Sequence, residues 1–211
     1  MAALIVLNQA RLWHKHGMVS RAPRPDRSRK PLTAAKLDEL ALAYVARFAT
    51  SRAKLTRYLA RKIRESEWVG DGDAMTACEA VADRMERLHF LDDRQYAAMR
   101  AGAMTRRGLG VRRVKAQLFV DGIAPEDSGE AVAEAAEKAL AAAIGFARRR
   151  RFGPFAVRAA DDPSQDPKDR ERQVAAFARA GHSLELARRI LSVPPGDSDA
   201  LAALDAEAAL D

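Results

Sequence analysis

The chain has 211 residues and a formal net charge of +7, with 36 Lys and Arg against 29 Asp and Glu. Because Cys78 is its single cysteine, the chain can form neither an internal disulfide nor a cysteine-based zinc cluster. No apolar run approaches the length of a membrane span, and the apolar opening is about half as long as the core of a signal peptide. We therefore expect a cytoplasmic protein that does not associate with membranes.

The composition favours helices. Only 6% of the residues are aromatic, whereas alanine, leucine and arginine dominate the chain. These three residue types are strong helix formers, and small and aliphatic side chains suit the packing of many short helices. The expected fold class is all-α, with almost no sheet.

Residues 1–32 are expected to form a disordered basic N-terminal tail. The first 30 residues hold seven basic side chains and one acidic side chain, and prolines interrupt the basic run 21–31. Such a segment cannot propagate a helix and has little apolar surface to bury. Met18 is a candidate for the true first residue, because no recognisable element precedes it.

Residues 33–89 are predicted to form a first unit of three helices. Apolar residues at helical spacing predict a helix over 37–48, and Ser51 offers an N-cap for a second helix that runs to about Arg64. The glycines of 70–72 break the chain before the third helix.

Residues 90–137 are predicted to form a second unit. The pair Asp92-Asp93 can cap the first helix, and the turn Gly108-Leu109-Gly110 separates it from the next helix. That helix ends at Asp121-Gly122, a glycine C-cap signal, and Pro125 begins a short third helix.

Residues 138–193 are predicted to form a third unit with an irregular insertion at 153–167. Its last two helices are expected over 168–180 and 183–193. A C-terminal tail, 194–211, is expected to follow the fold.

The middle helices of these units share a spacing of 59 residues. The corresponding positions are Leu55, Leu59 and Ile63; Val114, Leu118 and Gly122; and Gln173, Phe177 and Gly181. A constant period indicates repeated supersecondary units that bury their apolar faces against one another. The sequence therefore predicts three tandem three-helix repeats that form an elongated, curved array.

No set of residues predicts a catalytic or metal site. Helix capping explains Asp92-Asp93 better than metal binding does, and Cys78 is expected to be a small buried thiol. His89 and His182 lie at helix junctions, where a solvated or capping histidine is commoner than a ligand, and His14 and His16 lie in the tail. The Gly108-Leu109-Gly110 turn lacks the lysine and the preceding strand of a phosphate loop. We expect no enzymatic activity and no cofactor.

Basic side chains gather in three clusters, one in each unit. The segment 47–64 holds seven basic residues and no acidic one, and four of them lie on one helical face opposite the apolar face. A face of one sign loses stabilising ion pairs unless an anionic partner meets it, although ordinary solubilising charge is an alternative. Tyr58, beside the first cluster, could stack on a base but is more simply half-buried packing. The candidates for binding a partner are Arg52, Lys54, Arg57, Arg61, Arg64, Arg106, Arg107, Arg112, Arg113, Lys115, Arg148, Arg149, Arg150 and Arg151.

Three segments of the sequence resemble the RecX family of recombinase regulators. They are Phe90-Leu91-Asp92-Asp93-Arg94-Gln95-Tyr96-Ala97, the run from Arg106-Arg107-Gly108 to Val114, and Leu118-Phe119-Val120-Asp121-Gly122-Ile123. The segment Ser51-Arg52-Ala53-Lys54-Leu55 resembles the preceding repeat of that family, and the resemblance extends over about 33–193. Two features depart from the family pattern: unit one ends in Lys62-Ile63-Arg64-Glu65 without a glycine, and the insertion 153–167 is long.

The resemblance implies three tandem three-helix repeats without a catalytic centre or a metal. It also implies a monomer that binds the filament of RecA on single- or double-stranded DNA and modulates, mostly by inhibition, the ATPase, recombinase and coprotease activities of RecA in DNA repair and the SOS response. Two alternatives stay open: a stand-alone nucleic-acid-binding helical module without sequence specificity, and a helical scaffold for an unrelated acidic protein.

Overall fold

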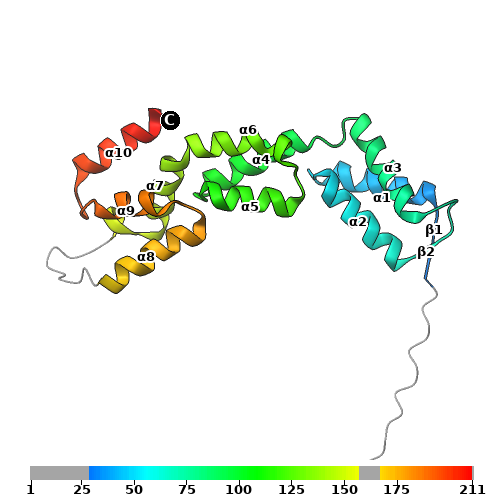
Figure 1. The fold of residues 1–211 in the computed structure, drawn as a ribbon, viewed down its shortest axis with the longest axis horizontal. Helices are drawn as coiled ribbons and strands as arrows, with labels where there is room; N and C mark the ends of the chain where they lie inside the picture. The colour runs from blue at the N-terminus through cyan, green and yellow to red at the C-terminus, as the bar shows by residue number, and fades with distance from the viewer. Residues whose placement is uncertain (1–28, 157–166, 211) are drawn as a thin grey trace, which may run out of the picture. The chain divides into compact units, whose positions relative to one another are not determined.

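The computed structural model describes residues 29–156 and 167–210 and is all-α (Figure 1). Its helices in chain order are α1 (Ala34–Arg47), α2 (Arg52–Glu65), α3 (Ala74–Arg87), α4 (Asp93–Arg106), α5 (Val111–Asp121), α6 (Pro125–Glu137), α7 (Ala139–Arg150), α8 (Pro167–Ala180), α9 (Leu184–Ser192) and α10 (Ser198–Leu210). The short elements are β1 (Pro31–Leu32), β2 (Glu67–Trp68) and the 3₁₀ turn η1 (Gly153–Phe155). The expected all-α class with almost no sheet is confirmed.

Helices α1, α2 and α3 share the first apolar core. The N-caps of these helices are Thr33, Ser51 and Asp73, and each side chain accepts a hydrogen bond from a backbone amide two or three residues into its helix. Leu55, Leu59 and Cys78 are fully buried in this core. The expectation of Ser51 as an N-cap and of Cys78 as a buried thiol is therefore confirmed.

A two-residue strand pair corrects the expected end of the N-terminal tail. Pro31 and Leu32 pair in parallel with Glu67 and Trp68, and Leu32 is buried in the first core. Since Leu32 carries an apolar side chain directly after the proline-interrupted run, it marks where the chain begins to pack. Residues 1–28, which contain most of the predicted tail, lie outside the described part of the chain.

Helices α4, α5 and α6 share the second core. Asp92 caps α4 by accepting a hydrogen bond from the amide of Gln95 at 2.7 Å, which confirms capping as its role. Gly122 ends α5 in the left-handed conformation at φ +81°, which only glycine adopts without strain. Pro125 begins α6, where its missing amide proton costs nothing.

Helices α7, α8, α9 and α10 share the third core around the fully buried Phe177. The expected C-terminal tail is wrong over Ser198–Leu210, because this segment is helix α10. Leu204 of α10 is buried in the third core, and two acidic side chains of α10 bind basic side chains of α7 and α9. An alanine-rich helix can pack with few large apolar residues. The lack of large apolar residues therefore made this segment look like an unstructured tail in the sequence.

The residues at the 59-residue spacing occupy matching environments. Leu55, Leu59, Val114, Leu118 and Phe177 are all buried, each in the core of its own helix group. The pattern therefore identified the helix face that packs. The elongated, curved arrangement of three repeats, with the boundaries 33–89, 90–137 and 138–193, stays a prediction.

Candidate functional site

A basic groove lies between α1, α2 and the C-terminal end of α5. Its volume is about 700 Å³, and we call it the basic groove. Four cationic side chains and three aromatic rings line it: Arg47, Lys54, Arg57, Arg61, Tyr44, Phe48 and Tyr58. The sequence placed three of the cations, Lys54, Arg57 and Arg61, on one face of α2, and the structure brings them together here.

The aromatic rings of the groove pack on one another and on the cations. Tyr44 and Tyr58 stack with ring centroids 4.3 Å apart, and the guanidinium of Arg61 lies 5.6 Å from the centroid of Tyr58. Arg47 lies 5.4 Å from the ring of Phe48. Tyr58 is half-buried, which confirms its interpretation as packing. The groove therefore combines positive charge with packed aromatic rings.

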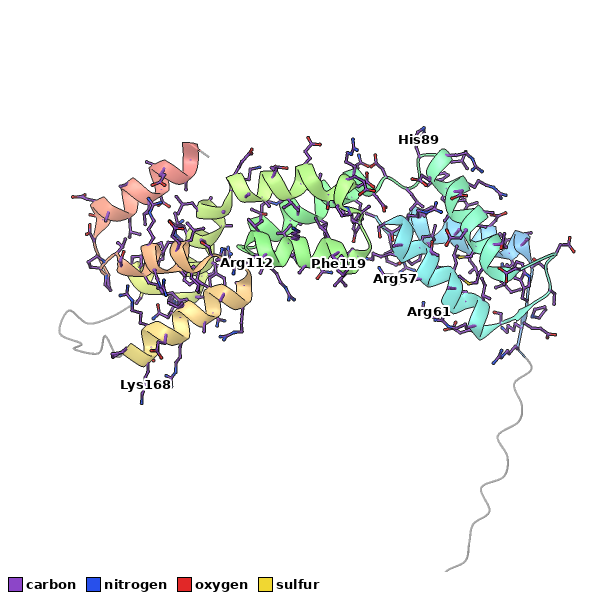
Figure 2. All side chains as sticks on the ribbon, viewed as in Figure 1. Arg57, Arg61, His89, Arg112, Phe119 and Lys168 are labelled. Carbon is purple, nitrogen blue, oxygen red and sulfur yellow. The ribbon has the colours of Figure 1, made fainter. Side chains whose placement is uncertain are left out.

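Arg57 connects α2 to the end of α5. Its Nε donates to the carbonyl of Ala53 at 3.2 Å, and Nη1 donates to the carbonyl of Val120 at 3.0 Å. The carbonyl groups at a helix C-terminus carry partial negative charge, so the guanidinium is stabilised there. Arg57 thus holds one wall of the groove in place (Figure 2).

Asp121 also lines the groove and is only 5% exposed. Its carboxylate accepts hydrogen bonds from the hydroxyl of Tyr96 and from the side-chain amide of Gln117, each at 3.0 Å. Nε of Arg100 lies 3.4 Å from the carboxylate, and Nζ of Lys54 lies 3.9 Å from it. A buried carboxylate needs such compensation. Apart from the helix end at Asp121, no local pattern in the sequence indicates these contacts.

Arg52 is directed away from the groove and binds α3. Its guanidinium forms ion pairs with three acidic side chains, Glu79, Asp83 and Glu86, at 2.6 to 3.0 Å. Burial opposes its charge, yet the hydrogen bond and charges of these acids raise the pKa of Arg52 above its ordinary value. The amide of Arg52 also donates to Asp93 at 2.8 Å. These contacts give Arg52 a structural role, and its binding of a partner stays a prediction.

Arg61 and Arg64 are exposed cations of α2, as is Arg57. Arg61 lies 3.8 Å from Glu65, a distance that contributes little at an exposed site. The charge of Arg64 interacts with that of the neighbouring Glu65, and among the described residues Arg64 forms no hydrogen bond or ion pair. Both side chains are available to an anionic partner.

The second predicted cluster lies along the outer face of α5 and the turn before it. Arg112, Arg113 and Lys115 are exposed and find no ionic partner within the described ranges. Arg106 and Arg107 end α4, where Arg106 lines a small depression that also contains Glu134. Two apolar residues of α5 are also exposed, Phe119 by 82% and Val120 by 59%. The sequence did not indicate their exposure.

Some arginines of the third predicted cluster contact other parts of the same protein. Arg148 pairs with Asp205 of α10 at 3.1 Å, and Arg149 donates to the carbonyl of Arg107. Arg150 lies 5.5 Å from the ring of Phe152, and Arg151 ends α7 at φ +56°. These arginines stabilise the end of α7, and their contact with a partner stays a prediction.

The expectation that His182 is a solvated or capping histidine is wrong. It is 2% exposed, between the rings of Phe146 and Phe177, so it is neither solvated nor a cap. Its Nε2 lies 3.0 Å from the carbonyl oxygen of Gly108, which identifies Nε2 as the protonated nitrogen. Burial lowers the pKa of His182, and it also raises the pKa of the Cys78 thiol.

Within residues 29–156 and 167–210, no group of three or more His, Cys, Asp or Glu side chains is arranged to hold a metal ion. None of the helices in these ranges combines the length and apolar character needed to span a membrane.

The sequence was compared with known proteins. No protein-family model matches it. It is 31% identical over 176 residues to the "Regulatory protein RecX" of Myxococcus xanthus, covering 81% of this chain and 91% of that protein. It is 29% identical over 140 residues to the "Regulatory protein RecX" of Agrobacterium fabrum, covering 66% of this chain and 72% of that protein.

The fold is similar to a solved structure. The crystal structure of RecX from Lactobacillus salivarius aligns with a TM-score of 0.55 at 15% sequence identity, covering 75% of this chain and 94% of that one. This likeness agrees with the all-α fold. On the strength of the identity and coverage shared with the Myxococcus protein, this chain belongs to the RecX family of regulatory proteins.

Proposed function

We propose that this chain is a non-enzymatic regulator that binds the RecA–DNA filament in its helical groove and inhibits the ATPase, recombinase and coprotease activities of RecA. It acts as a cytoplasmic monomer and needs no cofactor. Membership of the RecX family is the observation that carries this proposal. The basic groove and the exposed cations of α5 support it, because both filament DNA and acidic protein surfaces attract such charge.

Inhibition arises because one molecule of this protein contacts two neighbouring RecA protomers at the same time. A protein that bridges two protomers gains avidity from the second contact, and it favours the filament state in which both contacts persist. ATP hydrolysis and strand exchange require subunits to move relative to one another, so bridging slows both.

The first test is a titration of DNA-dependent ATP hydrolysis by the cognate RecA on single-stranded DNA. Inhibition well below one molecule per RecA protomer is expected. Absence of any effect at an excess of this protein would refute the proposal.

A matched pair of double variants tests the basic face of α2. Arg61→Glu with Arg64→Glu reverses two exposed cations on α2 without touching Arg57, whose guanidinium supports the groove wall. Arg87→Glu with Arg179→Glu makes the same change in net charge on exposed residues of α3 and α8. We expect the first pair to weaken inhibition about tenfold or more and the control pair to leave it within about twofold, since distant exposed charges act mainly through screened long-range attraction.

A stand-alone nucleic-acid-binding module is the second candidate. The cations Arg112, Arg113 and Lys115 favour it, because they find no ionic partner among the described residues and could hold phosphates without RecA. Affinity for bare DNA equal to that for the RecA filament would support this candidate over the first.

A further inference from the structure

The outer face of α5 combines exposed apolar and basic side chains. Arg112, Lys115, Ala116 and Phe119 have the i, i+3, i+4, i+7 spacing that places them on one strip of a helix, and all four are exposed. Figure 2 labels Arg112 and Phe119 toward opposite ends of α5. This strip differs from the basic groove, in which Arg47 and Arg61 pack on aromatic rings.

Phe119 is unusual for a surface residue. It is 82% exposed, and the next residue, Val120, is 59% exposed. A single exposed apolar residue is ordinary, but adjacent phenyl and isopropyl groups on one helix cost hydration free energy that a partner would recover. Val120, which follows Phe119 in the sequence but lies outside the strip, lines the basic groove.

The exposed charges of α5 are of one sign. The exposed ionisable residues of α5 are Arg112, Arg113 and Lys115, while the acidic residue of this helix, Asp121, is buried and compensated. A complementary surface must therefore be acidic around an apolar recess. Nucleic acid supplies negative charge and stackable bases, but it offers no recess for the aliphatic side chain of Val120.

We propose that α5 docks as a helix into an acidic, apolar-floored groove of a partner protein, with Phe119 as the anchoring side chain and Arg112 and Lys115 as the flanking charges. This inference rests on the proposed function, in which the partner is a RecA protomer of the filament. Large aromatic side chains buried at the centre of an interface carry most of its binding free energy, whereas charges at the rim mainly set its salt dependence. Phe119 then contributes to affinity for protein and nothing to affinity for bare DNA.

The test compares three single variants with the wild-type protein. Phe119→Ala removes the anchor, Phe119→Leu keeps an apolar side chain but cannot stack on a base, and Met99→Ala truncates an exposed apolar side chain on α4 as a control. Because the side chains of Phe119 and Met99 are exposed, all three variants should fold, which circular dichroism checks. Two affinities are measured for each: for the RecA filament assembled on single-stranded DNA, and for the same DNA alone.

We expect Phe119→Ala to weaken filament binding about tenfold, Phe119→Leu to restore it to within about threefold of wild type, and Met99→Ala to leave it unchanged. Binding to bare DNA should be the same for all four proteins. The inference would be overturned if Phe119→Ala also lowered the affinity for bare DNA and Phe119→Leu did not restore it. That result would mean that the ring stacks on a base. Filament binding by Phe119→Ala equal to that of wild type would also overturn it while leaving the proposed function intact. Absence of filament binding by the wild-type protein would overturn both.

Discussion

The hydroxyl of Tyr96 donates a hydrogen bond to the buried carboxylate of Asp121 and accepts one from Nζ of Lys54, both at 3.0 Å. The three residues come from α4, α5 and α2, so this chain of bonds joins the first and second helix groups. Ser51 adds a further bond, from its hydroxyl to the carbonyl of Asp121 at 2.7 Å. The position of Lys54 at the edge of the basic groove therefore depends on residues of another helix group.

Replacing Asp121 tests this dependence. Asp121→Ala leaves the Tyr96 hydroxyl without its acceptor and removes the carboxylate that lies 3.4 Å from Nε of Arg100, so we expect the free energy of unfolding to fall by about 3 kcal/mol. Glu130→Ala, on an exposed position of α6, is the control and should change stability by less than about 0.5 kcal/mol. Urea denaturation measures both, and equal stability of the two variants would contradict a compensating role for the buried carboxylate.

Arg52 gives a second prediction, because three acidic side chains of α3 already compensate its charge. Arg52→Gln should lower the free energy of unfolding by about 1 kcal/mol, since the ion pairs are partly exposed and therefore screened by solvent. It should leave inhibition of RecA within about twofold of wild type, in contrast to the double reversal of Arg61 and Arg64. A large loss of inhibition with unchanged stability would instead place Arg52 in the binding surface.

His182 predicts a pH dependence of stability. Its pKa is lowered in the folded state from an ordinary value of about 6.5, because burial penalises the charged ring. The unfolded chain therefore binds the proton more readily than the folded chain does. The stabilisation that the neutral ring provides is complete above pH 6.5 and is lost as the pH falls toward the lowered pKa.

The variant His182→Gln keeps an N–H donor for the carbonyl of Gly108 and removes the titration. We expect the wild-type protein to lose stability between pH 7.5 and pH 5.5 with a slope of at most about 1.4 kcal/mol per pH unit, and the variant to lose less. Thermal or urea unfolding at several pH values gives the two slopes. Parallel curves would show that another group controls the acid response.

Local signals in the sequence predicted much of the fold. The caps Ser51, Asp92 and Gly122 act through backbone groups within a few residues, so their chemistry is visible in a short window. Helical spacing likewise identified Leu59 and Leu118 as core residues, because periodicity alone defines a buried face. These signals needed no knowledge of which helices meet.

Contacts between distant segments could not be predicted in this way. The sequence marks Asp121 only as the end of a helix. In the structure it accepts hydrogen bonds from Tyr96 and from Ser51, which lies 70 residues earlier in the chain. The basic face of α2 was predicted correctly, but Arg57 proved to bind the carbonyl of Val120, which only the folded chain brings near. The interpretation of His182 failed for the same reason, since its acceptor lies 74 residues earlier.

Two glycine turns that the sequence marked separately lie in direct contact. The amide of Gly110 donates to the carbonyl of Ala180 at 2.9 Å, and the amide of Arg112 donates to the carbonyl of Gly181 at 3.2 Å. A Cβ built at Gly181 would lie 2.4 Å from the amide nitrogen of Arg113, closer than real side chains approach a backbone. Gly181 also has φ +93°. Both the close approach of Arg113 and this left-handed conformation therefore favour glycine at position 181.

Gly181→Ala should therefore destabilise the fold more than the backbone conformation alone explains. Gly72→Ala provides the matched control, because Gly72 has φ +74° but a Cβ built there meets nothing within 4 Å. We expect the control to cost about 1 kcal/mol, the price of a left-handed alanine, and Gly181→Ala to cost at least about 3 kcal/mol, because well-packed backbones cannot separate locally. Urea denaturation of both variants gives the difference. Equal costs would mean that the two turns separate easily, and that the hydrogen bonds of Gly110 and Arg112 contribute little to holding α5 against the α8–α9 turn.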